Sequence, residues 1–161
     1  MDSFKNVFSL SGKTALVIGA GGLGLPIARA LMQNGADIVL ADMKEPDGAF
    51  AEDCRAEGRQ CFFVPVNLLD EESVVKMVAE ARQKTGRIDI LVNAAGVNKL
   101  IKAEDYDSKA WDFVLGINLR GLYLVTREVG KVMIEQNYGR ILSISSVKSL
   151  IGTDQDYTAY C

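Results

Sequence analysis

The 161-residue sequence contains no histidine. This absence excludes a Ser-His-Asp triad, a Cys-His dyad, histidine zinc ligands and a histidine general base, so any proton transfer needs another side chain. Cysteine is also scarce, since Cys54, Cys61 and Cys161 are odd in number and form no C-x-x-C pair. Neither a disulfide framework nor a thiolate metal site is indicated, and we expect no metal and a reducing, cytoplasmic location.

The sequence also lacks a basic excess and a long apolar run. Its formal net charge of −3 provides no broad positive field for a phosphate backbone, which argues against nucleic acid as a partner. No stretch reaches the roughly 18 apolar residues of a membrane span. Residues 1–6 carry mixed charge and no apolar signal-peptide core. We therefore expect a soluble, unsecreted protein with no membrane partner.

The residues that are present are typical of a folded domain. Apolar residues make up 48% of the chain and charged residues 24%, which is average globular usage. The length fits one hydrophobic core, so we expect residues 1–161 to form a single domain. Short apolar runs alternate with longer segments of helical period, which is the pattern of βαβ units and a parallel sheet. The expected strands cover residues 14–18, 38–41, 61–64, 88–92 and 140–144.

Three of the expected helices have features that a structure can test. A long helical region over about 109–136 contains Gly116 and Gly121, which we expect to break or tighten it. Another helix is expected to begin at the cap residue Asp70. The apolar residues on its buried face are Val74, Met77, Val78 and Ala81. The helix after the first strand has a predicted core stripe of four-residue spacing, consisting of Leu23, Ile27 and Leu31.

The strongest local signal is a G-x-G-x-x-G motif directly after the first expected strand, with the sequence Gly19-Ala20-Gly21-Gly22-Leu23-Gly24. Glycine permits a tight turn, close approach of the backbone to a pyrophosphate and close packing of helix on strand. The amide groups at the start of the following helix attract an anion. This context favours a dinucleotide site, and a glycine-rich turn without a ligand is the alternative.

An acidic residue at the end of the second expected strand strengthens the dinucleotide interpretation. Asp42 lies about 20 residues beyond the glycine motif, where a carboxylate can accept hydrogen bonds from the adenosine ribose hydroxyls. The same carboxylate repels a 2′-phosphate, so the sequence favours NAD over NADP. The alternative for Asp42 is a solvated loop acid.

From Ser11 to its last residue, the chain resembles the first two-thirds of a short-chain dehydrogenase/reductase. Four further segments agree with that family in order and spacing: Asn67-Leu68, Asn93-Ala94-Ala95-Gly96, Asn118 and Ser145-Ser146. The resemblance implies a Rossmann-like, doubly wound parallel sheet with strand order 3-2-1-4-5 and helices on both faces. The chain lacks the segments that form the family's C-terminal strands.

The resemblance also implies which residues bind the cofactor. The family residue at position 67 lies by the adenine and is commonly Asp, so Asn67 is a mild departure. The turn at residues 93–96 supports the sheet and borders the cofactor, with a purely structural role for Asn93 as an open alternative. The cofactor-binding residues are expected to be Gly19, Gly21, Gly22, Leu23, Gly24, Asp42, Asn67, Leu68, Asn93, Ala94 and Gly96.

The same resemblance implies a catalytic group that needs no histidine. Tyr160 resembles the tyrosine that exchanges a proton with the substrate oxygen, and Ser146 resembles the serine that hydrogen-bonds that oxygen, with Ser145 as an alternative. Asn118 resembles the asparagine that anchors a proton-relay water. The family's activating lysine follows the tyrosine by four residues, and here that position lies beyond the last residue, Cys161.

These features support three hypotheses. The first is an NAD-linked oxidoreductase that moves hydride between nicotinamide and the carbon of a small secondary alcohol or ketone. The second, favoured by the missing lysine, is a catalytically silent nucleotide-binding or assembly fragment. The third is a flavodoxin-like flavin binder. Sugar-acid and polyol dehydrogenases and 3-oxoacyl reductases all share the motif combination.

Two departures from the family affect these expectations. The glycine loop is one residue shorter than usual and has Ile18 where the family has threonine, so a polar contact to the phosphates is missing. Without a neighbouring sixth strand, residues 140–145 form an exposed apolar edge, which invites pairing with another chain. We therefore expect a homo-oligomer.

Overall fold

The computed structural model describes residues 7–151 and 156–160. Cys161, one of the three cysteines, lies outside the described residues. A five-stranded parallel sheet has the order β3-β2-β1-β4-β5, as predicted. The strands are β1 (Thr14–Ile18), β2 (Asp37–Asp42), β3 (Cys61–Pro65), β4 (Ile90–Asn93) and β5 (Arg140–Ser143).

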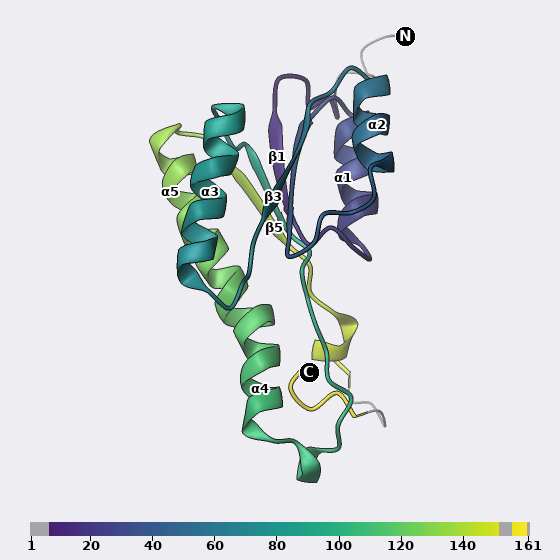
Figure 1. Ribbon diagram of the computed structural model, residues 1–161, viewed down its shortest axis with the longest axis vertical. Helices are drawn as coiled ribbons and strands as arrows, with labels where there is room; N and C mark the ends of the chain where they lie inside the picture. Colours follow the sequence, from purple (N-terminus) through teal and green to yellow (C-terminus); the bar gives the residue numbers. More distant parts are fainter. Residues whose placement is uncertain (1–6, 152–155, 161) are drawn as a thin grey trace.

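Helices cover both faces of the sheet (Figure 1). One face carries α1 (Gly24–Gln33) and α2 (Ala49–Ala56), and the other carries α3 (Glu71–Thr85) and α5 (Leu122–Glu135). The helix α4 (Ser108–Leu115) extends beyond the carboxyl ends of the strands. The chain therefore forms the predicted Rossmann-like, doubly wound α/β fold.

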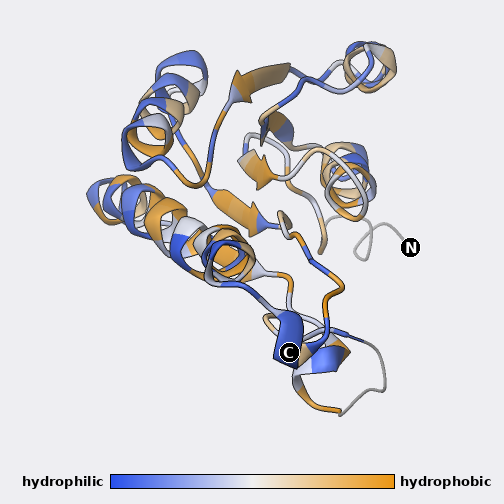
Figure 2. Cartoon of the chain, turned by 60° about the horizontal axis from the view of Figure 1, so that its bottom comes forward, coloured by the Kyte–Doolittle hydropathy of each residue, from blue (hydrophilic) through white to orange (hydrophobic). Residues whose placement is uncertain are grey.

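Strand β1 forms the centre of the core. Its residues from Ala15 to Ile18 are fully buried, which explains the continuous apolar run in the sequence. Alternate side chains face opposite layers: Leu16 and Ile18 pack with α3 and α5, whereas Ala15 and Val17 pack with α1 and α2. Figure 2 shows the hydrophobic strands enclosed by helices with hydrophilic outer surfaces. The sheet thus needs helices on both faces.

Helix α3 agrees with its prediction, whereas the predicted stripe of α1 is confirmed only in part. Asp70 caps α3 by accepting a hydrogen bond from the Glu72 amide, and the predicted apolar face of α3 is buried. In α1 the fully buried residues are Gly24, Ala28 and Met32, while Ile27 and Leu31 of the predicted stripe are partly buried against the core and Leu23 is not. Leu23 is 62% exposed because Gly24, the residue without a side chain, is the one that touches the end of β1.

The predicted long helix is interrupted by a wider π-helical segment between its two glycines, Gly116–Gly121. A Cβ atom on Gly116 would lie 2.6 Å from Leu69 Cδ2, and one on Gly121 would lie 2.8 Å from Leu68 Cβ. The two glycines therefore let the loop after β3 pack closely against the helix. The interruption expected from the sequence is therefore found at the two glycines, where the loop after β3 packs against the helix.

Two kinds of feature are absent from the described part of the chain. Within residues 7–151 and 156–160, no helix is both long and apolar enough to cross a bilayer. The same residues hold no group of three or more His, Cys, Asp or Glu side chains suited to a metal ion. Cys54 and Cys61 are free thiols.

Strand β5 leads to a prediction about self-association. It is the last strand of the described sheet on its side, and its Ile141 and Leu142 side chains are 44% and 54% exposed. An open apolar edge pairs readily with a second chain, so we expect the 161-residue protein to self-associate. Light scattering across a dilution series measures this. Leu142→Lys should shift the protein toward monomer, whereas Val75→Lys, at a residue 44% exposed on α3, should not. A wild-type chain that stays monomeric at every concentration contradicts the prediction.

Candidate functional site

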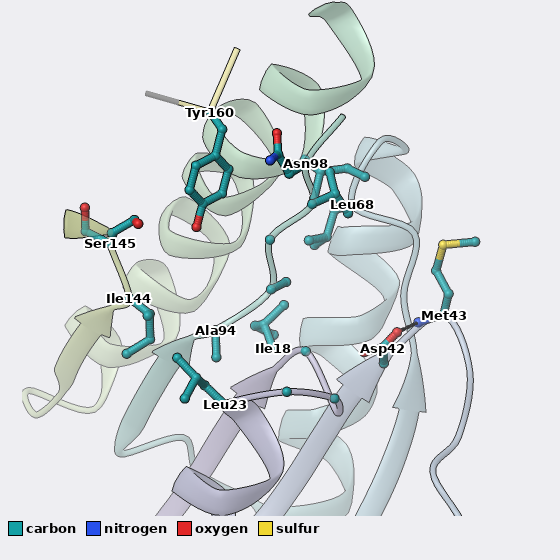
Figure 3. Close-up of a pocket in the computed structure, with 18 of the residues that line it drawn as sticks. Ile18, Leu23, Asp42, Met43, Leu68, Ala94, Asn98, Ile144, Ser145 and Tyr160 are labelled. Atoms are coloured by element: carbon teal, nitrogen blue, oxygen red, sulfur yellow. Dashed lines mark hydrogen bonds between the residues drawn. The ribbon is translucent and has the colours of Figure 1, made fainter. Parts of the chain in front are cut away.

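A cavity of about 920 Å³ lies at the carboxyl ends of the strands. The segments that follow all five strands contribute to its lining, because parallel strands end at the same edge of the sheet. Figure 3 shows side chains from these segments around one opening. The predicted residues that line it are Gly19, Gly21, Gly22, Leu23, Asp42, Asn67, Leu68, Ala94, Gly96, Ser145, Ser146 and Tyr160.

The glycines of the motif have two distinct roles. A Cβ atom on Gly19 would lie 2.8 Å from the Ala95 nitrogen, and one on Gly24 would lie 1.7 Å from the Gly19 oxygen. These two positions need glycine for close packing. In contrast, Cβ atoms on Gly21 and Gly22 would meet no atom within 4 Å, so this part of the loop is open to the cavity.

The start of α1 is suited to an anion. No side chain caps its first turn, and that turn contains no acidic residue. By comparison, Asp70 caps α3, and Asp107 caps α4 by accepting a hydrogen bond from the Ala110 amide. The amide dipoles at the start of α1 therefore face the cavity without a competing negative side chain.

Asp42 connects the second strand to the glycine loop. One carboxylate oxygen accepts a hydrogen bond from the Ala20 amide at 2.7 Å. The other accepts one from the Met43 amide at 2.6 Å (Figure 3). The carboxylate thus fixes the loop as well as lining the cavity. A carboxylate oxygen can accept more than one hydrogen bond, so Asp42 keeps acceptor capacity for a ligand hydroxyl.

The loop after β3 is shaped by Asn67. Its side-chain oxygen accepts a hydrogen bond from the Leu69 backbone amide at 3.1 Å. The backbone amide of Asn67 donates one to Ser73 Oγ at 2.9 Å. Leu68, the next residue, lines the cavity and also packs into the core. The loop thereby presents one polar and one apolar side chain to the cavity.

Asn93, which was expected to bind the cofactor, does not line the cavity. Its side-chain nitrogen donates hydrogen bonds to Thr126 Oγ1 at 3.0 Å and Ser143 Oγ at 3.1 Å. The side chain is fully buried, and its oxygen has no partner among the described residues. These contacts join β4 to α5 and β5, whereas Ala94 and Gly96 reach the cavity itself.

Asn118 also supports the cavity from outside the lining. It lies in the π-helical segment, and its side-chain oxygen accepts a hydrogen bond from the Val97 amide while its nitrogen donates one to the Val97 carbonyl, both at 2.8 Å. This pair of bonds fixes the backbone of Val97, which does line the cavity. The side chain of Asn118 therefore acts on the loop after β4.

The predicted catalytic hydroxyls come from two segments that meet at the cavity. Ser146 precedes the short 3-10 helix η3 (Val147–Ser149), and its Oγ accepts a hydrogen bond from the Lys148 amide at 3.2 Å. Tyr160 points its ring into the cavity (Figure 3). A bridge between Tyr157 and Ile101 holds the segment that carries Tyr160.

Several lining residues were not predicted from the sequence. Met43 follows β2, Asn98 lies in the loop after β4, and Lys148 lies in the segment after β5. Their position just beyond the carboxyl end of a parallel strand is a signal that could have found them. The other unpredicted side chains around the cavity include Phe113, Ile144, Val147 and Tyr157.

Comparison with known proteins agrees with this geometry. The family model described as "short chain dehydrogenase" matches residues 13–161. The chain belongs to the short-chain dehydrogenase family. Its relatives include the oxidoreductase UcpA of Salmonella typhimurium, which is 40% identical over 152 residues. This match covers 94% of the chain and 58% of the relative, so the chain spans under two-thirds of that protein's length.

Two further relatives have names that specify an activity. The NAD-dependent glycerol dehydrogenase of Listeria innocua is 35% identical and matches 98% of the chain and 61% of its own length. A gluconate 5-dehydrogenase of Burkholderia cenocepacia, solved with NADP and tartrate, has a TM-score of 0.89 and 30% identity, covering 98% of the chain and 62% of that structure. The chain is therefore similar both to a relative named for NAD and to a structure solved with NADP.

Proposed function

We propose that the protein is an NAD(H)-dependent oxidoreductase that interconverts a small secondary alcohol and its ketone. One observation carries the proposal: a single cavity joins the uncapped start of α1 and Asp42 to the hydroxyl-bearing residues Ser146 and Tyr160. The first group suits the phosphates and ribose of a dinucleotide, and the second suits the oxygen of a substrate. Family membership supports the combination.

The residues around the cavity fit a dinucleotide. The open backbone at Gly21 and Gly22 lets a pyrophosphate approach the amides of α1, and Asp42 accepts hydrogen bonds from the adenosine ribose. Because a carboxylate repels a 2′-phosphate, we propose NAD rather than NADP. Asn67 and Leu68 would contact the adenine. When bound, the nicotinamide supplies or accepts the hydride.

The proposed proton chemistry uses the chain's own hydroxyls. In the reductive direction, Tyr160 donates its phenolic proton to the substrate oxygen, and in the oxidative direction it accepts that proton. Ser146 donates a hydrogen bond to the same oxygen and orients the substrate. We propose that the segment containing Asn118 anchors the water that returns protons to Tyr160.

The test combines turnover with binding. Absorbance at the NADH band is followed with a panel of ketones, and NADH affinity is measured separately by fluorescence. We expect Tyr160→Phe to lower turnover by about a hundredfold or more, because general acid catalysis typically contributes that much, while NADH still binds. Thr158→Ser, close to Tyr160 but absent from the cavity lining, is the control. If the protein binds NADH but reduces no ketone, the alternative of a silent nucleotide-binding chain replaces the proposal. A yellow preparation that binds flavin and not NADH contradicts both.

A further inference from the structure

Met43 differs in exposure from the other methionines in the described part of the chain. It is 73% exposed and lines the cavity beside Asp42 (Figure 3). By contrast, Met32, Met77 and Met133 are at most 7% exposed and belong to the core. We propose that Met43 is an oxidation site and that its conversion to the sulfoxide weakens dinucleotide binding, an inference that rests on the proposed function.

The backbone holds Met43 at one end of the cavity. Its amide donates a hydrogen bond at 2.6 Å to Asp42, the carboxylate proposed to bind the adenosine ribose. The last register pair of β2 and β3 joins Asp42 to Pro65, so Met43 leaves the sheet beside the loop that contains Asn67 and Leu68. We propose those two residues as contacts of the adenine. The thioether of Met43 therefore lines the part of the cavity that would hold the adenosine.

Oxidation changes the property of Met43 that suits it to this place. The thioether is flexible, apolar and polarisable, and its contact with an aromatic ring changes a binding constant by up to about tenfold. The sulfoxide is polar and chiral, so it favours water over the face of an adenine ring. The side chain stays uncharged, and the contact of Asp42 with the ribose is unaffected. Affinity for the dinucleotide should therefore fall without being lost.

The chemical step balances with a peroxide as the oxidant. A lone pair of the Met43 sulfur attacks one peroxide oxygen, so a sulfur–oxygen bond forms as the oxygen–oxygen bond breaks. The departing hydroxide takes the proton of the transferred oxygen and leaves as water. The sulfur is oxidised by two electrons, the peroxide is reduced by two, and a methionine sulfoxide reductase reverses the change.

The described cysteines compete poorly for the same oxidant. Peroxide reacts with the thiolate rather than the thiol. Burial raises the pKa of the Cys54 thiol and raises the pKa of the Cys61 thiol to about 12, so both are protonated at neutral pH. Cys54 is also fully buried. Among the described sulfur-containing side chains, Met43 is therefore the one that peroxide should oxidise first.

The first measurement identifies the oxidised residue. The full chain is treated with hydrogen peroxide at neutral pH, with and without saturating NAD⁺, and peptide mass spectrometry follows oxygen uptake at each methionine. We expect Met43 to be oxidised faster than Met32, Met77 and Met133, because exposure determines access of the oxidant. Bound NAD⁺ should slow the oxidation of Met43, since the adenosine would cover its sulfur.

The second measurement links the modification to binding. NADH affinity is measured by fluorescence before peroxide treatment and again after the peroxide is removed. We expect oxidation to weaken NADH binding about fivefold, within the range for contact between a methionine sulfur and a ring. Met43→Gln, with a polar side chain of similar length, should lower the affinity by a similar factor without peroxide.

Two further variants assign the effect to one sulfur atom. Met43→Leu has no thioether at this position, so its affinity for NADH should be the same before and after peroxide. Met77→Leu removes a buried thioether instead and should lose affinity on treatment as the wild type does. Thermal melting of each variant confirms that it is folded.

Several results would overturn the inference. These are oxidation of Met43 no faster than that of the buried methionines, no protection by NAD⁺, unchanged affinity once Met43 is oxidised, or a loss that persists in Met43→Leu. Affinity that recovers after a methionine sulfoxide reductase restores Met43 supports the inference, and affinity that stays low contradicts it. Failure of the untreated wild type to bind NADH overturns the proposed function itself, and it is seen before any peroxide is added.

Discussion

Gly24→Ala should destabilise the fold by about 3 kcal/mol, at the upper end of the usual range for overpacking. The added Cβ atom would lie 1.7 Å from the oxygen and 2.9 Å from the carbonyl carbon of Gly19. Both are backbone atoms, so no side chain can rotate away to relieve the contact. The start of α1 must then move off the end of β1, and we expect nucleotide binding to be lost with it.

The motif provides its own control. A Cβ atom on Gly21 meets nothing within 4 Å, so Gly21→Ala should unfold at the same urea concentration as the wild type. Urea denaturation followed by circular dichroism measures both variants. If Gly24→Ala and Gly21→Ala unfold at the same midpoint, the close packing of α1 on β1 does not matter for stability and this account of the motif is wrong.

The second large effect is expected at Asp89, at the opposite end of the sheet from the cavity. This carboxylate is fully buried, and it accepts hydrogen bonds from the Thr14 amide at 3.0 Å and from two Arg87 nitrogens at 2.6 Å. Lys13 lies 3.8 Å away. Asp89→Ala leaves the Thr14 amide buried without its partner, so we expect a loss of about 3 kcal/mol in the free energy of unfolding.

The control for Asp89→Ala is an exposed ion pair. Arg82 and Glu135 are 2.6 Å apart, but their side chains are 47% and 60% exposed. Removing Glu135 should change the free energy of unfolding by less than about 1 kcal/mol. Equal effects of Asp89→Ala and Glu135→Ala in urea denaturation contradict the assignment of a structural role to the buried carboxylate.

Asp89 also gives stability a dependence on pH. Burial by itself raises the pKa of its carboxyl, but hydrogen bonds from Arg87 and Thr14 and the charge of Lys13 more than offset burial and lower the pKa below its usual value of 3.8. Because the folded pKa lies below the unfolded one, the contribution of Asp89 is present above about pH 4 and is lost as the pH falls through the folded value. Asp89→Asn should therefore show a shallower loss of stability below pH 4.

Much of the fold could be predicted because the chain follows simple rules locally. The continuous apolar run of β1 identifies a strand buried on both faces, and the face and cap of α3 follow from helical spacing and Asp70. The stripe of α1 could be placed only in part by hydrophobicity, because Ile27 and Leu31 pack against the core but the innermost contact is made by Gly24, which has no side chain. The expected strand 88–92 begins later, at Ile90, although the backbone of Asp89 already pairs with Thr14 and Arg140.

The candidate site was predicted less completely than the fold. The glycine loop and Asp42 could be identified because their spacing determines where the backbone and the end of a strand lie. Lys148 has no motif, and its place in the cavity depends on how the segment after β5 meets Tyr157. Spacing also does not determine side-chain direction: Asn118, expected to anchor a proton-relay water, directs its side-chain amide to Val97.

We propose that this cavity binds NAD through the glycine loop and Asp42. The most direct measurement is a fluorescence titration of the wild-type chain with NADH and, in parallel, with NADPH. We predict that NADH binds at least tenfold more tightly and that Asp42→Ala reduces this difference. Equal or tighter binding of NADPH, or no binding of either dinucleotide, would contradict the account.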